Sequence, residues 1–215
     1  MTERVVIYGA GGLGREILQA LREMSACGRA VDCIAFIVDE AFAAPDMVNG
    51  VPVYRDFHEL AQDESVRFVV AIGDPIGRAR VARALEKAIG QRFTTIIHPR
   101  AVTGTTVTIG TGTMIMGLSS VTTECRIGRH VLVNPGCTIA HDVDVADFAT
   151  LSPGVNLAGR VRLGEGCMLG IGVSIAPDVN VGSWSIVGAG ACVLRSVAAN
   201  TVAVGVPAQM IATRE

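Results

Sequence analysis

A histidine and an aspartate stand side by side in the segment Ala140-His141-Asp142. An imidazole accepts a proton near neutral pH, and a neighbouring carboxylate can hold one ring nitrogen or tune the basicity of the ring. The pair therefore has the composition of a general base, such as the deprotonation of an attacking amine requires. The alternative is an exposed histidine at a corner of the chain that has no catalytic role.

A glycine-rich segment near the N-terminus could bind phosphate groups. Gly9, Gly11 and Gly14 follow the pattern G-x-G-x-x-G between an apolar run and a segment of helical periodicity. Glycines let backbone N–H groups approach a diphosphate, and the N-terminus of a helix favours its charge. Three interpretations stay open: a tight turn without ligand, a dinucleotide site, or a site for another nucleotide diphosphate. The third is favoured because the surrounding segment is too short for a full six-stranded dinucleotide fold.

The other histidines predict no metal centre. His58 is expected on the surface, His98 as a cap, and His130 at a structural corner of the chain. A zinc enzyme built on stacked repeats would need three converging histidines, and the repeat region holds only His130 and His141. We therefore expect no metal.

The candidate general base lies within a six-residue repeat. The repeated positions are Thr103, Ile109, Ile115, Val121, Ile127, Val133, Ile139, Val145, Leu151, Leu157, Leu163, Leu169, Ile175, Val181, Val187 and Val193. Neither an α-helix nor a flat strand holds this period, whereas stacked repeats do. Short β-branched strands joined by small-residue corners predict a left-handed parallel β-helix of roughly five coils, with about 18 residues in each. His141 falls at a corner, so its ring is expected to face solvent or a neighbouring subunit.

Residues 1–98 lack this period and alternate between strand-like and helix-like segments. Strands are expected at 5–8, 33–38, 67–72 and 93–97, and helices over 15–24 and from 75 to about 88. This alternation predicts an α/β, Rossmann-like domain over 1–98, followed by the β-helix with a short C-terminal cap over 99–215. Asp39, at the end of the second strand, is a candidate contact for a ribose or a base edge.

Composition narrows the possible partners. The formal net charge of -2 gives no reason to expect nucleic acid or an anionic membrane as a ligand. The N-terminus has no signal-peptide pattern and no apolar stretch reaches about 18 residues, so we expect a cytoplasmic protein without membrane insertion. No Cys-x-x-Cys pair occurs, and Cys125, Cys137 and Cys167 occupy inward positions of the repeat, as packed thiols do.

Taken in order, these motifs resemble those of a known family over nearly the whole chain. The matching segments are Gly9 to Arg15, His98-Pro99, Asn134-Pro135-Gly136, His141-Asp142, Ser152-Pro153-Gly154 and Gly205 to Ala208. The set is similar to the hexapeptide-repeat nucleotide-sugar acetyltransferases. That family includes bacterial enzymes that acetylate a 4-amino-4,6-dideoxy sugar on its nucleotide carrier, for lipopolysaccharide O-antigen biosynthesis.

The resemblance implies a homotrimer that binds acetyl-CoA in grooves between its subunits. It makes His141 the general base and Asp142 its tuning partner, and it assigns Asn134 to the sugar amine. The backbone N–H of Gly159 is implied to bind the thioester carbonyl. Further implied contacts are Ala176, Pro177 and Pro207 for acetyl-CoA, and Gly9, Gly11, Gly12, Gly14, Asp39, Gly73, Asp74 and Arg78 for the nucleotide sugar.

Two departures from the family pattern bear on the acceptor. Members that act on UDP-sugars usually carry a second histidine nine residues after the base, where this chain has Thr150, and many carry histidine in place of Leu13. The chain is more similar to the GDP-perosamine branch. A UDP-linked 4-amino sugar or O-acetylation of a sugar remains an alternative. From other classes, the alternatives are an NAD-dependent oxidoreductase, for which a β-helix offers no hydride-acceptor site, and a non-catalytic scaffold that binds a nucleotide sugar.

Overall fold

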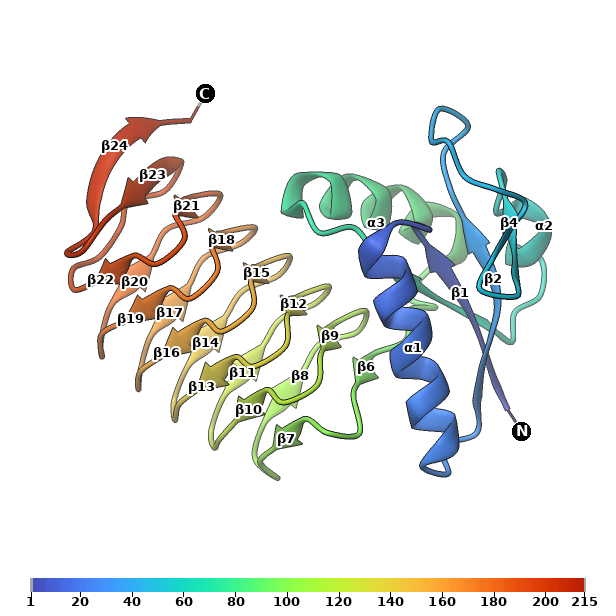
Figure 1. The fold of residues 1–215 in the computed structure, drawn as a ribbon, viewed down its shortest axis with the longest axis horizontal. Coiled ribbons are helices and arrows are strands. Elements are labelled where there is room, and N and C mark those ends of the chain that lie inside the picture. The colour runs from blue at the N-terminus through green and yellow to red at the C-terminus, as the bar shows by residue number, and fades with distance from the viewer. Residues whose placement is uncertain (1, 215) are drawn as a thin grey trace. The chain divides into compact units, whose positions relative to one another are not determined.

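The computed structural model describes residues 2–214, which form two compact units (Figure 1). One unit ends at Pro99 and the other begins at Arg100, one residue beyond the expected boundary. The first is an α/β unit and the second a parallel β-helix, so the predicted fold class is confirmed. No helix within residues 2–214 is long and apolar enough to cross a bilayer.

The first unit is built on a five-stranded sheet of order β3-β4-β2-β1-β5. Its strands are β1 (Glu3–Tyr8), β2 (Val31–Ile37), β3 (Met47–Val48), β4 (Val51–Tyr54) and β5 (Val66–Val70). All pairings are parallel except that of β3 with β4, which form an antiparallel hairpin. Val5, Val6 and Ile7 are fully buried, as expected for a parallel strand covered on both faces.

The helices of this unit are α1 (Gly12–Ala26), α2 (His58–Ala61) and α3 (Pro75–Ile89). Helix α1 buries Ile17, Leu18 and Leu21, so the predicted apolar face is confirmed. The hairpin β3–β4 and the short helix α2 were not predicted. The strand expected at 93–97 is reduced to β6 (Ile96–Ile97), because Phe93 makes only an isolated bridge with Phe68.

Up to β22, the second unit consists of two-residue strands that pair in parallel with the strands 18 residues away. One sheet contains β7 (Val102–Thr103), β10 (Ser120–Val121), β13 (Thr138–Ile139), β16 (Asn156–Leu157), β19 (Ser174–Ile175) and β22 (Cys192–Val193). The next contains β8 (Thr108–Ile109), β11 (Arg126–Ile127), β14 (Asp144–Val145), β17 (Arg162–Leu163) and β20 (Asn180–Val181). The third runs through β9 (Met114–Ile115), β12 (Leu132–Val133), β15 (Thr150–Leu151), β18 (Met168–Leu169) and β21 (Ile186–Val187) to β23 (Thr201–Val204) and the antiparallel β24 (Gln209–Thr213).

The six-residue pattern forms the core of this prism. Every repeated aliphatic residue from Ile115 to Val193 is at most 3% exposed. Cys125, Cys137 and Cys167 are also buried and free, so their prediction as packed thiols is confirmed. Burial in this core raises the pKa of Cys167 to about 12, which keeps that thiol protonated.

The corners of the prism stack into three columns, one beside each pair of sheets. We call the corners that follow β7, β10, β13, β16 and β19 the His141 edge, because His141 lies between β13 and β14. Many of these corners turn through a residue in the left-handed region of φ, and Asp142 is one of them, with φ 61°. Aspartate is among the residues that tolerate this conformation, since its short side chain bonds locally.

Candidate active site

The imidazole of His141 and the carboxylate of Asp142 form a hydrogen-bonded pair. The distance from Nδ1 to Oδ2 is 2.7 Å, and each side chain is 52% exposed. The Asp142 N–H donates to the carbonyl of Thr123 on the preceding coil at 3.1 Å, which holds the corner in place. When Nδ1 donates its proton to the carboxylate, Nε2 is left as the nitrogen that can accept a proton.

The His141 ring lies against the backbone of Gly159, one coil further along the same edge. A Cβ at position 159 would stand 2.6 Å from ring Cε1 and 2.7 Å from Nε2. Any side chain there would therefore displace the ring. The Gly159 carbonyl accepts from the N–H of Asp178 at 3.2 Å, whereas no residue between 2 and 214 accepts from the Gly159 N–H. A proton acceptor and a backbone donor thus lie side by side.

The other residues implied for acetyl-CoA lie further along the β-helix. Ala176 and Pro177 occupy the His141 edge one coil beyond Gly159, and the Ala176 N–H donates to Val193 at 2.9 Å. Pro207 is exposed in the turn between β23 and β24, next to Ala208, whose N–H donates to Cys192 on β22 at 2.8 Å. The described chain thus lines up His141, Gly159 and Pro177 on one edge, with Pro207 in the C-terminal turn.

Asn134 and Thr150 do not lie on this edge. Asn134 follows β12 at another corner column, and its Nδ2 donates to the carbonyl of Leu151 at 2.8 Å. Thr150 is an outward residue of β15 but only 3% exposed. Within one subunit, the structure therefore does not bring Asn134 to His141.

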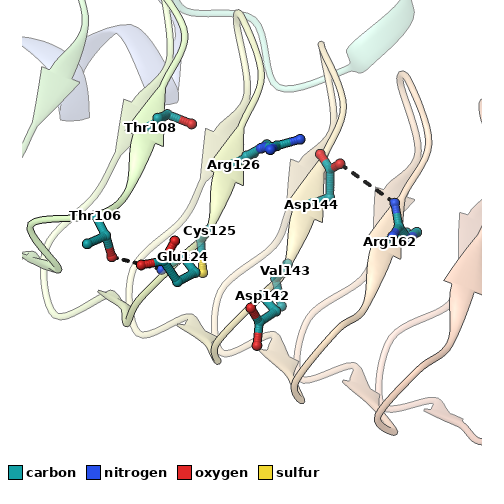
Figure 2. Close-up of a pocket in the computed structure, with 9 residues that line it drawn as sticks. All are labelled: Thr106, Thr108, Glu124, Cys125, Arg126, Asp142, Val143, Asp144 and Arg162. Carbon is teal, nitrogen blue, oxygen red and sulfur yellow. Dashed lines mark hydrogen bonds and ion pairs between the residues drawn. The ribbon is translucent and has the colours of Figure 1, made fainter.

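A cavity of about 450 Å³ opens beside the His141–Asp142 dyad, on the sheet that contains β14 (Figure 2). It is lined by Thr106, Thr108, Glu124, Cys125, Arg126, Asp142, Val143, Asp144 and Arg162. Figure 2 shows Arg126, Asp144 and Arg162 projecting from successive strands, and Arg162 reaches Asp144 at 4.0 Å. Sequence reasoning missed this wall of alternating charge, although a period of 18 residues relates its members.

In the first unit, the glycines of the N-terminal loop divide into two kinds. Gly9 has φ 110°, and a Cβ there would stand 2.7 Å from the carbonyl oxygen of Ala71. A Cβ on Gly14 would stand 1.9 Å from the carbonyl oxygen of Gly9, so both glycines serve close packing. Gly11 and Gly12 meet nothing closer than 4.0 Å. These two therefore leave backbone open to a ligand.

The open glycines face a cavity of about 350 Å³ in the same unit. Its lining includes residues 9–13 of the loop, Asp39 after β2 and Gly73 after β5. Helix α1 starts at Gly12 with Gly11 as its N-cap, so the first N–H groups of a 15-residue helix lie at this cavity. Such a helix N-terminus favours a phosphate group.

Asp39 stands between this cavity and a second one. Both cavities are lined by Tyr8 and Asp39, and the second, of about 260 Å³, also contains Arg80. The Tyr8 hydroxyl donates to Asp39, and Arg80 lies 3.9 Å from the same carboxylate. Burial and the hydrogen bond to Asp39 raise the pKa of Tyr8 to about 12, so the hydroxyl remains a donor. Sequence reasoning missed Tyr8 and Arg80, although Tyr8 ends the strand that leads into the loop.

Arg78, which the family resemblance implies as a nucleotide contact, lies behind the loop that follows β5. Its side chain is fully buried, and Nη1 donates to the carbonyls of Ile72 at 2.6 Å and Gly73 at 3.0 Å. Burial lowers the pKa of Arg78 to about 10, which still leaves it charged. Arg78 therefore holds the loop after β5 from behind. Asp74 is exposed and caps α3, accepting from the Gly77 N–H at 2.7 Å.

The remaining histidines have structural surroundings. His58 is exposed beside Asp56, as predicted. His98 is buried and its Nε2 lies 3.0 Å from Glu23, so it pairs with α1 instead of acting as a cap. The buried His130 ring stacks on Phe148, with centroids 5.3 Å apart. Within residues 2–214, no three His, Cys, Asp or Glu side chains gather as a metal site requires.

Two protein families match parts of the chain. The family described as PglD N-terminal domain matches residues 4–85, and the family described as Bacterial transferase hexapeptide (six repeats) matches residues 160–195. Among curated proteins, the GDP-perosamine N-acetyltransferase of Escherichia coli O157:H7 is 31% identical over 147 residues. That match covers 67% of this chain and 65% of the relative, slightly less than two thirds of its length.

Solved structures match nearly the whole chain. A histidine mutant of perosamine N-acetyltransferase from Caulobacter crescentus, in complex with CoA and GDP-perosamine, has a TM-score of 0.87 and is 32% identical. The match covers 97% of this chain and 96% of that one. The acetyltransferase domain of PglB from Neisseria gonorrhoeae, in complex with acetyl coenzyme A, has a TM-score of 0.86 at 26% identity, covering 98% and 100%.

The two matched families follow the same order as the two units of this chain. The Caulobacter enzyme shares more than 30% identity over almost the full length of both chains. The chain therefore belongs to the family of hexapeptide-repeat nucleotide-sugar N-acetyltransferases.

Proposed function

We propose that this protein transfers the acetyl group of acetyl-CoA to the 4-amino group of a nucleotide-linked 4-amino-4,6-dideoxy sugar, with GDP-perosamine as the best candidate. The observation that carries the proposal is the contact of the Asp142-oriented His141 ring with the backbone of Gly159. This contact combines a base and an N–H donor, the two groups that acyl transfer to an amine needs. The relatives solved with CoA and GDP-perosamine support the same substrates.

In the proposed mechanism, His141 Nε2 takes a proton from the sugar amine as the amine nitrogen attacks the thioester carbonyl. The new C–N bond gives a tetrahedral intermediate whose oxyanion accepts a hydrogen bond from the Gly159 N–H. The C–S bond then breaks, and the proton held by His141 returns to the CoA sulfur. Asp142 keeps the ring oriented through Nδ1 and stabilises its charged form.

The nucleotide half of the acceptor is proposed to bind in the first unit. Its diphosphate would lie at Gly11 and Gly12, where α1 begins and where a Cβ would meet open space. Asp39 would accept from the ribose or from a base edge, with Tyr8 fixing the direction of its carboxylate. The loop that contains Gly73 and Asp74 would form the opposite wall.

The proposed assembly is a cytoplasmic homotrimer. Asn134 lies at a different corner column from His141, so a contact of Asn134 with the amine beside His141 needs a second subunit. In a closed ring, a different surface of the neighbour can supply such a residue. The six free cysteines fit a reducing compartment. Sedimentation at micromolar concentration should show a trimer, and a stable, active monomer would refute this assembly.

The test of the function is a substrate panel. The protein is mixed with acetyl-CoA and with GDP-perosamine, UDP-linked 4-amino sugars, or GDP-sugars that lack the amine, and release of the CoA thiol is followed. We expect fast release only with a 4-amino sugar, and a product that resists hydroxylamine, as an amide does and an ester does not. Tight sugar-nucleotide binding without thiol release would support the scaffold alternative. Hydroxylamine-labile product would indicate O-acetylation.

A further inference from the structure

A column of charged side chains runs along the His141 edge, one position after the histidine. The corner positions 124, 142, 160 and 178 are occupied by Glu124, Asp142, Arg160 and Asp178, all with φ between 54° and 64°. Identical corner geometry makes these side chains leave the edge in register, one on each coil. Neighbouring strands in a sheet lie about 4.8 Å apart. Each residue is therefore within reach of the one above and the one below.

Arg160 is the one cation of this column among residues 2–214, and it lies between two carboxylates. Its Nε donates to Asp178 Oδ1 at 2.7 Å and its Nη2 donates to Asp178 Oδ2 at 2.8 Å. Its backbone N–H donates to the carbonyl of His141 at 3.0 Å, which anchors Arg160 directly above the dyad. The guanidinium thus bonds Asp178, whereas Asp142, one coil away on the other side, acts on it through its charge alone.

Asp142 has a different partner, because its Oδ2 binds His141 Nδ1. A guanidinium makes two-pronged, charge-assisted bonds with any carboxylate that it can reach. An arginine on Asp142 would compete for the oxygen that orients the ring, and its charge would oppose protonation of the imidazole. The dyad therefore depends on where Arg160 points.

Further charged groups near Asp142 belong to its own column and to the adjoining sheet. Glu124 lies on the coil below in the same column and carries a negative charge. On the adjoining sheet, Arg126, Asp144 and Arg162 line the cavity that Asp142 also lines, and Arg162 is directed to Asp144 at 4.0 Å. The bonds from Arg160 lower the pKa of Asp178.

We propose that Asp178 is a positioning residue. By binding the guanidinium of Arg160, it prevents that group from bonding Asp142 and so preserves the His141–Asp142 pair. The proposal rests on the proposed function, in which His141 is the general base. In this proposal Asp178 acts through Arg160, to which it is bonded, and not by contact with the reacting atoms.

The test is a double-mutant cycle of Asp178→Asn, Arg160→Asn and the double variant. Asparagine tolerates the left-handed φ at both positions, so neither substitution strains its corner. Asp178→Asn should lower kcat about tenfold, within the range of couplings between residues of one network. Arg160→Asn should stay near wild type, and the double variant should regain most of the lost activity. The acidic limb of the pH–rate profile should move to lower pH in Asp178→Asn and return in the double variant.

A merely structural ion pair makes a different prediction. It would make Arg160→Asn as harmful as Asp178→Asn, without recovery in the double variant, and that result would overturn the proposal. Wild-type kcat in Asp178→Asn would overturn it as well. His141→Asn, measured in parallel, distinguishes failure of this proposal from failure of the proposed function. If His141→Asn is inactive but the double variant regains no activity, only the role of Asp178 is refuted. If His141→Asn is active, the proposed base itself is wrong.

Discussion

The imidazole of His141 rests on the backbone of Gly159, so closely that a Cβ at position 159 would stand 2.6 Å from the ring. Real Cβ atoms do not come this close to other atoms, so the ring position depends on the absence of a side chain. The two residues are joined by one coil of the β-helix. In the proposed mechanism, this contact sets how far the base on His141 lies from the Gly159 N–H.

Gly159→Ala should therefore reduce activity without unfolding the protein. The new methyl group would push the ring aside, and the half-exposed ring has room to move. A displaced base lowers the rate of the chemical step, by about 10²-fold for a shift of about 1 Å, because the reacting groups are no longer aligned. Steady-state kcat and a thermal melt would check this. Ser174→Ala, on an exposed outward position of β19, is the control that should change neither. Full activity in Gly159→Ala would contradict the assigned contact.

His141→Asn should lower kcat by about 10²–10⁴-fold, the usual contribution of a general base. Binding of acetyl-CoA and of the nucleotide sugar should survive, since the exposed ring contributes little to the core. Calorimetry for both ligands and single-turnover rates would check the separation. If the variant kept more than about half of the wild-type kcat, positioning alone would drive the reaction.

Asp142→Asn should be milder than loss of the histidine, with kcat reduced about tenfold, because the carboxylate orients the ring and stabilises its charged form. Asparagine fits φ 61° at this corner, so the melting temperature should stay near that of wild type. Asp142→Ala is the informative comparison, since alanine does not favour this conformation. It should lose both activity and stability. An Asp142→Asn variant as inactive as His141→Asn would show that the carboxylate has a larger role.

Gly11→Val should raise the KM for the nucleotide sugar at least about tenfold and leave acetyl-CoA binding intact. Position 11 has φ -75°, which valine accepts, and a Cβ there meets nothing closer than 4.0 Å. The added side chain therefore fills ligand space without disturbing the fold. Gly14→Ala is the contrasting variant, because its Cβ would stand 1.9 Å from the Gly9 carbonyl oxygen. That variant should lose stability. Tight NAD binding to the wild type would count against a sugar-nucleotide loop.

Val145→Asp should unfold the β-helix. Val145 is 1% exposed, and burial of such a side chain stabilises by about 1.5–3 kcal/mol. The substitution loses this burial free energy. It also leaves an unpaired charge inside the β-helix, which lowers the free energy of unfolding by several kcal/mol more. Ser174→Asp adds the same charge on the outward side of a neighbouring coil and should melt normally. Normal melting of Val145→Asp would refute the inward register of the repeat.

Local sequence determined the architecture of the second unit. An aliphatic residue at every sixth position fits neither a helix nor a flat strand. The stacking and the inward register therefore follow from the pattern alone. The same holds for the order of β1, α1, β2, β5 and α3, because each has its own apolar periodicity. The dyad was visible for a similar reason, since His141 and Asp142 are adjacent in the chain.

Only the tertiary structure decided which distant residues meet. Gly159 lies against the His141 ring, and Asp178 holds Arg160, because the coils stack in register and the corner φ sets each side-chain direction. The family resemblance implies Arg78 as a ligand contact, whereas in the structure its side chain points into the protein and donates to two carbonyls. Spacing along a chain does not encode the direction of a long side chain. That direction follows from the backbone groups left to satisfy once the surrounding elements have packed.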